Sequence, residues 1–485
     1  MIDRRALILG TGGLGASLGL GGISVAGRGD LFDLAEGLRG GGPDEAFHGA
    51  EAAIKRGATP EELLGAVFLI GVCDVKPRHV GGKLHCVMMV NSAFQLTEAL
   101  GPRDRYLAAL WNLNDLKVSQ ARDKREHGDW KLSPAPKAQR LDPAVAAKNM
   151  RQAMDRWDED GADQAVVDLA AAADRDFTMG VLWPYAARHF ASIGHNIIYA
   201  AQVDRTLARI GWEYAVPALR SLVYGLLNQP SGKQTGAWAA AGEALAHLPE
   251  DWPVGDPDQA KSEALANGLV GASREEALAL MIAAAAGGAG QRAAWDAAAL
   301  AASQIVLARS ASQVGTSAAL LTVHGLTENE AFRHAAGRTQ DESLRRRLLL
   351  QSVAWLVDVR DFLTGRGLLQ DPLPGFARDK DAAGPKTLDA LWQEPTPLAA
   401  QRALERRPEW LAPFERHMQR SHFFGAQEHH QPKYAAAALS LSKQVAPGLA
   451  PRILAPMLPY LPSATVPSTD VAKRSLAALD RAQVR

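Results

Sequence analysis

Helical periodicity dominates this sequence from Leu31 onward. Apolar residues recur three and four positions apart, and alanine is frequent enough to let helices approach one another closely. The sequence offers β-strands little to start from. Because 485 residues exceed the size of one ordinary domain, we predict an all-α protein, a large multi-helix body of packed helix pairs.

Two helix starts are marked by capping boxes at residues 59–62 and 273–276. The segments around these boxes resemble each other, and a histidine follows each of them: His85 after the first and His324 after the second. The next asparagine comes six residues later in one case and five in the other, so the match is inexact. A weak internal duplication and chance similarity in an alanine-rich chain both remain open.

Proline-rich breaks divide the chain, but none is long enough to act as a free linker between domains. We therefore expect an N-terminal helical half at residues 27–235 and a C-terminal half at residues 236–485, packed as one continuous body. Residues 1–26 are predicted to be an export signal.

The export prediction depends on the first thirty residues. Arg4 and Arg5 precede a weakly apolar, glycine-rich stretch and a small-x-small cleavage site at residues 24–26, which resembles a twin-arginine signal. This pattern predicts a periplasmic or secreted protein. The glycines at residues 10–15 also fit a dinucleotide-binding turn, and an uncleaved segment would leave the protein cytoplasmic, but the short glycine-interrupted stretch that follows is a poor crossover helix.

Charge and cysteine content exclude several classes of function. Lysine plus arginine and aspartate plus glutamate both number 53, so no net field attracts nucleic acid. No apolar run reaches the ~18 residues of a membrane span. Cys73 and Cys86 allow at most one disulfide and no four-thiolate metal site. Phosphate loops and haem-attachment motifs do not occur.

Three histidines lie inside apolar helical stretches, where burial is expected: His85, His195 and His324. A buried neutral imidazole must satisfy one donor and one acceptor, and a backbone carbonyl or a nearby asparagine is the ordinary partner. The alternative is that imidazoles from separate helices converge on a metal ion, each oriented through its second nitrogen.

A second group of polar residues follows residue 427. His429 and His430 precede Pro432 and are predicted to lie in a turn, with one imidazole pointing inward. We add His430 to the proposed metal ligands. Lys433 and Tyr434 come next, at the start of an alanine-rich helix, and are predicted to supply a cation and a phenol as catalytic groups beside His430. A solvated helix entry is the competing interpretation.

Segments 188–195, 218–225 and 323–327 resemble the questin oxidase-like proteins. The resemblance implies a helical, histidine-containing protein, and a member of that group is associated with Baeyer–Villiger-type oxidation of polyketides. The predicted export signal does not fit an NADPH-dependent cytoplasmic oxygenase, because reduced nicotinamide is not available outside the inner membrane. Other segments, at residues 77–94, 111–130 and 429–434, resemble an uncharacterised group of exported bacterial proteins.

These observations lead to two hypotheses. The first is an exported oxidoreductase that acts on a small molecule through a redox metal, copper or iron, bound by His85, His195, His324 and His430. The second is a non-enzymatic helical solenoid or binding protein whose histidines are packed separately and lie far apart. The substrate and the oligomeric state do not follow from the sequence.

Overall fold

The computed structural model describes residues 30–189, 193–228, 236–309, 317–370, 385–393, 396–461 and 469–484. Within these ranges the regular secondary structure is helical, apart from one isolated β-bridge between Arg309 and Leu369. The prediction of an all-α, multi-helix protein is confirmed. Residues 1–29, and with them the predicted export signal, lie outside the described residues.

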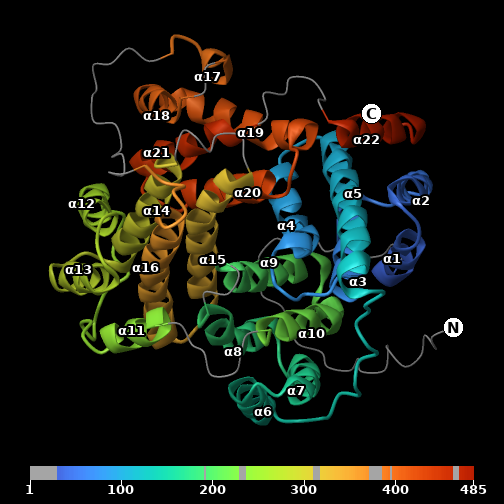
Figure 1. Ribbon diagram of the computed structural model, residues 1–485, viewed down its shortest axis with the longest axis horizontal. Coiled ribbons are helices and arrows are strands. Elements are labelled where there is room, and N and C mark those ends of the chain that lie inside the picture. Colours follow the sequence, from blue (N-terminus) through green and yellow to red (C-terminus); the bar gives the residue numbers. More distant parts are fainter. Residues whose placement is uncertain are drawn as a thin grey trace.

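The α-helices follow one another along the chain in four groups (Figure 1). The first group is α1 (Leu31–Arg39), α2 (Pro43–Lys55), α3 (Pro60–Asp74), α4 (His85–Thr97) and α5 (Pro102–His127). The second is α6 (Pro143–Arg156), α7 (Glu159–Ala172), α8 (Arg175–Ala187), α9 (His195–Ile210) and α10 (Ala215–Leu226). The third is α11 (Gly236–Leu245), α12 (Gln259–Leu269), α13 (Arg274–Ala286), α14 (Gln291–Leu307), α15 (His324–Arg338) and α16 (Glu342–Thr364). The fourth is α17 (Ala390–Gln393), α18 (Pro397–Arg406), α19 (Leu411–Gly425), α20 (His430–Ser442), α21 (Ala450–Leu454) and α22 (Asp470–Arg481).

Short 3₁₀ helices lead into several of these α-helices. They are η2 (Gly82–Leu84), η3 (Trp212–Tyr214), η5 (Ser317–Val323), η6 (Pro408–Trp410), η7 (Pro447–Leu449) and η8 (Ala455–Tyr460). The capping boxes predicted from the sequence both form. Thr59 and Glu62 cap α3 reciprocally, and Ser273 and Glu276 cap α13 in the same way. Each box satisfies backbone N–H groups that have no partner within the helix.

Four helices enclose the centre of the molecule: α4, α9, α15 and α20 (Figure 1). Each contacts the next, so that α4 packs on α9, α9 on α15, α15 on α20 and α20 on α4. Two of them come from the predicted N-terminal half and two from the C-terminal half. The buried apolar side chains of both halves form one cluster that runs from Leu31 to Leu479.

Two further expectations concern the whole chain. Within the described residues, no helix is both long and apolar enough to cross a membrane. Cys73 and Cys86 are free thiols, so the disulfide that the sequence allowed is not formed. The internal duplication stays a prediction, although α4 and α15 share one local feature: each begins with a histidine directly after a 3₁₀ helix.

Candidate metal centre

Each of the four proposed metal ligands is the first residue of one of the four central helices. His85 begins α4, His195 begins α9, His324 begins α15 and His430 begins α20. Since these helices pack in a ring, their first residues are brought together. The first three histidines are at most 5% exposed, and the side chain of His430 is 15% exposed.

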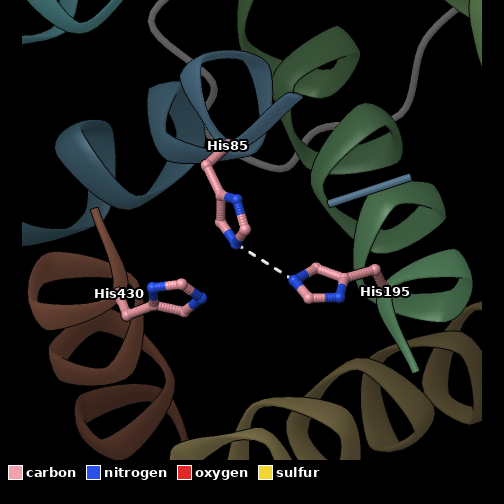
Figure 2. A group of neighbouring side chains, drawn as sticks. All are labelled: His85, His195 and His430. Atoms are coloured by element: carbon pink, nitrogen blue, oxygen red, sulfur yellow. Dashed lines mark hydrogen bonds between the residues drawn. The ribbon is translucent and has the colours of Figure 1, made fainter. Parts of the chain in front are cut away.

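The imidazole rings meet through their Nε2 atoms (Figure 2). The Nε2 atoms of His85 and His195 are 3.0 Å apart, and those of His195 and His324 are 3.3 Å apart. Candidate donor atoms of His85, His195 and His430 all lie within 4.8 Å of one another. The ring of His430 lies 5.2 Å from that of His324, centroid to centroid. The expectation that these histidines lie far apart, one part of the non-enzymatic hypothesis, is therefore wrong.

The opposite ring nitrogen is held by an oxygen acceptor in three of the four histidines. Nδ1 of His85 lies 2.5 Å from the carbonyl oxygen of Gly82, and Nδ1 of His324 lies 3.1 Å from that of Leu321. Nδ1 of His430 lies 2.6 Å from a carboxylate oxygen of Glu428. Because an oxygen acceptor requires N–H on Nδ1, the neutral tautomer leaves a lone pair on Nε2. Those lone pairs point toward the shared centre.

Glycines allow the backbone to close around His195. A Cβ atom on Gly81 would lie 3.2 Å from the His195 ring, so the chain passes directly over the imidazole. Gly194, immediately before His195, has φ +80° and caps α9 in the left-handed region. Residues with a Cβ atom rarely adopt this conformation. The ring's position therefore depends on two backbone sites that accept only glycine readily.

Burial keeps the cluster neutral. It lowers the pKa of His85, His324 and His430 well below the usual value for histidine. The positive charge of neighbouring groups, Lys433 among them, lowers these pKa values further. Neutral imidazole is the form that binds metal ions. At pH 7 these rings are ready to act as ligands without first losing a proton.

Lys433 lies in the cluster and Tyr434 does not contact it. The Lys433 side chain is 1% exposed, and its Nζ lies 3.1 Å from Nε2 of His85. Burial lowers the pKa of Lys433 to about 7. Tyr434 packs its ring against Tyr460, and within the described part of the chain its hydroxyl has no hydrogen-bond partner. Adjacent helical residues point about 100° apart, which separates the two side chains.

The prediction of a turn is confirmed for His429, which lies in the turn that caps α20, and is wrong for His430, which is the first residue of that helix. Both rings belong to the site. His429 stacks on His85 with centroids 4.1 Å apart, and it also lies 3.6 Å from Asp115. The sequence identified His429 and His430 as candidate site residues, but it did not show the direction in which each ring points.

One residue of the site was missed altogether. Glu328 lies on α15, four residues after His324 and 2% exposed. Positions i and i+4 share a helix face, so this spacing was the signal that could have found it.

His422, a buried histidine outside the cluster, gives a pH-dependent prediction. It is fully buried on α19 with Nδ1 2.5 Å from the carbonyl oxygen of Met418, and burial lowers its pKa to about 4. Between pH 6.5 and 4 the unfolded chain therefore binds a proton there that the folded chain does not, so stability falls with falling pH. At ~1.4 kcal/mol per pKa unit, the loss is about 3 kcal/mol.

Urea unfolding of metal-free protein from pH 7 to pH 4 measures this effect. The wild-type protein should lose about 3 kcal/mol more than His422→Gln, because glutamine does not titrate in this range. Equal losses in the two proteins would show that His422 is already free to take up a proton in the folded state.

Comparisons of the chain with protein-family models, with curated proteins and with solved structures gave no match. The assignment of a function therefore depends on the geometry of the histidine cluster.

Proposed function

We propose that the protein is an oxidoreductase that binds one redox metal ion through His85, His195, His324 and His430 and acts on a small molecule. The supporting observation is the orientation of the rings. Two Nε2 lone pairs, on His85 and His324, face the Nε2 atom of His195 at 3.0 and 3.3 Å. In the metal-free protein, a proton on that atom can satisfy one of them, and Lys433 can donate to that of His85 from 3.1 Å. A cation at the centre satisfies all of the nitrogens together.

The donor set favours iron, copper or zinc over Mg²⁺ and Ca²⁺, and the redox role that we propose requires iron or copper. Imidazole nitrogens suit Fe, Cu and Zn, whereas Mg²⁺ and Ca²⁺ prefer oxygen ligands. The oxygen acceptors on Nδ1 are the partners that usually orient metal-binding histidines. Four nitrogen ligands leave positions open on a six-coordinate ion, where dioxygen or substrate binds. A redox ion with open positions supports an oxidase or oxygenase activity.

Lys433 provides a proton at this centre. Its pKa of about 7 means that it gains and loses a proton near neutral pH, within hydrogen-bonding distance of His85. A group whose pKa lies close to the working pH is effective in general acid–base catalysis. We assign it this role, and we expect Tyr434 to support the fold through Tyr460. The proposal includes a periplasmic or secreted location, which depends on the export signal predicted at residues 1–26.

Metal analysis tests the proposal directly. The full chain, loaded anaerobically with Fe(II) or with Cu(II) and desalted, should retain about one ion per chain. His195→Gln and His324→Gln should each retain less than a tenth of that amount, because each removes a ligand and second-shell changes alone cost ~10–100-fold in affinity. Elemental analysis by mass spectrometry gives the content, and circular dichroism confirms folding.

His334→Gln is the matched control. His334 is a partly buried histidine on the same helix as His324, about 15 Å farther along α15, and its Nε2 lies 2.7 Å from Asp204. Its replacement should leave metal content unchanged. A folded wild-type protein that retains no metal would favour the non-enzymatic hypothesis. Retention of zinc alone would contradict the redox role.

A further inference from the structure

The Glu328 carboxyl group lies beside the histidine cluster. Glu328 follows His324 by one turn of α15, so the two side chains share a face of that helix. Its carboxyl also abuts α9, because a Cβ atom on Gly194 would lie only 1.6 Å from Oε1 of Glu328. Gly194 directly precedes His195. The carboxyl therefore occupies the corner between the helices that carry two of the proposed ligands.

This carboxyl group has no partner of its own among the described residues. Its Oε1 is buried without a hydrogen bond, and no lysine or arginine of the described chain forms an ion pair with it. Glu330, two residues later and equally buried, shows the usual arrangement: it binds Arg205 with both oxygens and accepts a hydrogen bond from Ser440. A buried polar group without a partner is costly and calls for an explanation.

Burial also determines what Glu328 can do. It raises the pKa of this carboxyl well above the usual value, and the nearby positive charge of Lys433 offsets only part of the effect. A neutral carboxylic acid has an O–H group that donates a hydrogen bond. The protonated Glu328 carboxyl is thus a hydrogen-bond donor that has no acceptor among the described residues.

The charge of the centre indicates which acceptor it lacks. Four neutral imidazoles do not compensate a divalent ion. The Glu428 carboxylate beside His430 offsets one positive charge, but Lys433 adds another beside His85. Uncompensated charge in a buried site is unfavourable, so an anion on the metal stabilises the centre. Neither Glu328 nor His324 belongs to the group of donor atoms that lie within 4.8 Å of one another, but His324 places its Nε2 atom 3.3 Å from that of His195. Among the described residues the Glu328 carboxyl has no hydrogen bond to any of the four imidazoles, so we place it outside the ring of ligands.

We propose that Glu328 donates a hydrogen bond to a small anionic ligand that occupies an open position on the metal. This inference rests on the proposed function, because it requires the metal. The inference places the open coordination position of the metal at the corner between α9 and α15. It also explains Gly194, since a side chain there would take the space of the carboxyl.

Azide serves as the probe, since it is a small anion and its complexes with Fe(III) and Cu(II) absorb visible light. The wild-type protein, loaded with Cu(II) or loaded with Fe(II) and then oxidised to Fe(III), is titrated with sodium azide alongside Glu328→Leu and Glu328→Gln, and metal content is measured for each protein. Leucine has no donor, so the azide Kd should rise about 10–100-fold, as expected for a lost hydrogen bond to a charged group. Glutamine keeps an N–H donor, and its Kd should stay within about threefold of the wild-type value.

Glu330→Gln provides the matched control, as it removes a buried carboxyl from the same helix outside the cluster and should leave the azide Kd unchanged. An unchanged Kd in metal-loaded Glu328→Leu would overturn the inference. So would azide binding at least tenfold tighter in Glu328→Gln, because this would mean that the wild-type carboxylate is ionised and repels anions. If the wild-type protein retains no metal, the proposed function fails and this inference fails with it; if metal is retained, the azide result decides the inference alone.

Discussion

The Lys433→Met variant of the metal-free protein should be more stable than the wild-type protein at pH 6, by about 3 kcal/mol. Burial lowers the pKa of Lys433 from 10.5 to about 7, so at pH 6 the folded protein carries a buried ammonium group. At ~1.4 kcal/mol per pKa unit, this charge costs about 5 kcal/mol. Methionine removes the charge at similar size, but it also removes the hydrogen bond to His85, which offsets about 1–3 kcal/mol.

The size of this stability difference changes with pH in a defined window. Between pH 7 and 10.5 the unfolded chain binds the Lys433 proton and the folded chain does not, so the wild-type protein gains stability as the pH rises. The advantage of Lys433→Met should therefore shrink from pH 7 to pH 9. Urea unfolding of both proteins in the presence of a chelator measures it. A variant that is less stable at pH 6, or a difference that does not change with pH, would contradict this account.

Lys83→Met is the matched control, because Lys83 is also buried but forms an ion pair with Asp123. Removing one member of a buried pair leaves the other uncompensated, so this variant should lose about 3 kcal/mol. The two lysines should thus respond in opposite directions. A buried cation that destabilises the fold is typical of functional sites, where stability and activity are in conflict.

The Gly194→Ala variant should lose about 3 kcal/mol of stability and most of its metal. The backbone at position 194 has φ +80°, and a residue with a Cβ atom lowers the free energy of unfolding there by ~1–2 kcal/mol. The new methyl group would also overlap Oε1 of Glu328. Overpacking of this kind adds ~1–3 kcal/mol. Because His195 follows directly, relief of the overlap moves a proposed ligand. Urea unfolding and metal analysis measure the two effects.

Two further variants separate strain from overlap. Gly180→Ala, in the interior of α8 with open space around it, should be neutral or stabilising by up to ~1 kcal/mol. The double variant Gly194→Ala/Glu328→Ala should regain about half of the stability lost in Gly194→Ala, since only the backbone strain remains. If the double variant is as unstable as the sum of the two single variants, the contact between Gly194 and Glu328 does not matter.

The site could be predicted only in part. His85, His195 and His324 were identifiable because an imidazole inside an apolar helical stretch must be buried. The contact of Lys433 with His85 was not, because 348 positions separate the two residues. Nor did the sequence distinguish Lys433 from Tyr434, since the direction of each side chain depends on the rotation of α20 about its axis. Glu328 was missed because a glutamate in a helix is ordinarily solvated.

Local patterns in the sequence determined the helices. The apolar spacing from Leu31 onward gave the helical class, and the boxes at Thr59 and Ser273 placed two helix starts, because both depend on residues within one or two turns. Only the tertiary structure decided that four helices begin at one point, each with a histidine. That arrangement depends on which helix faces pack together, and packing is a property of surfaces distant along the chain.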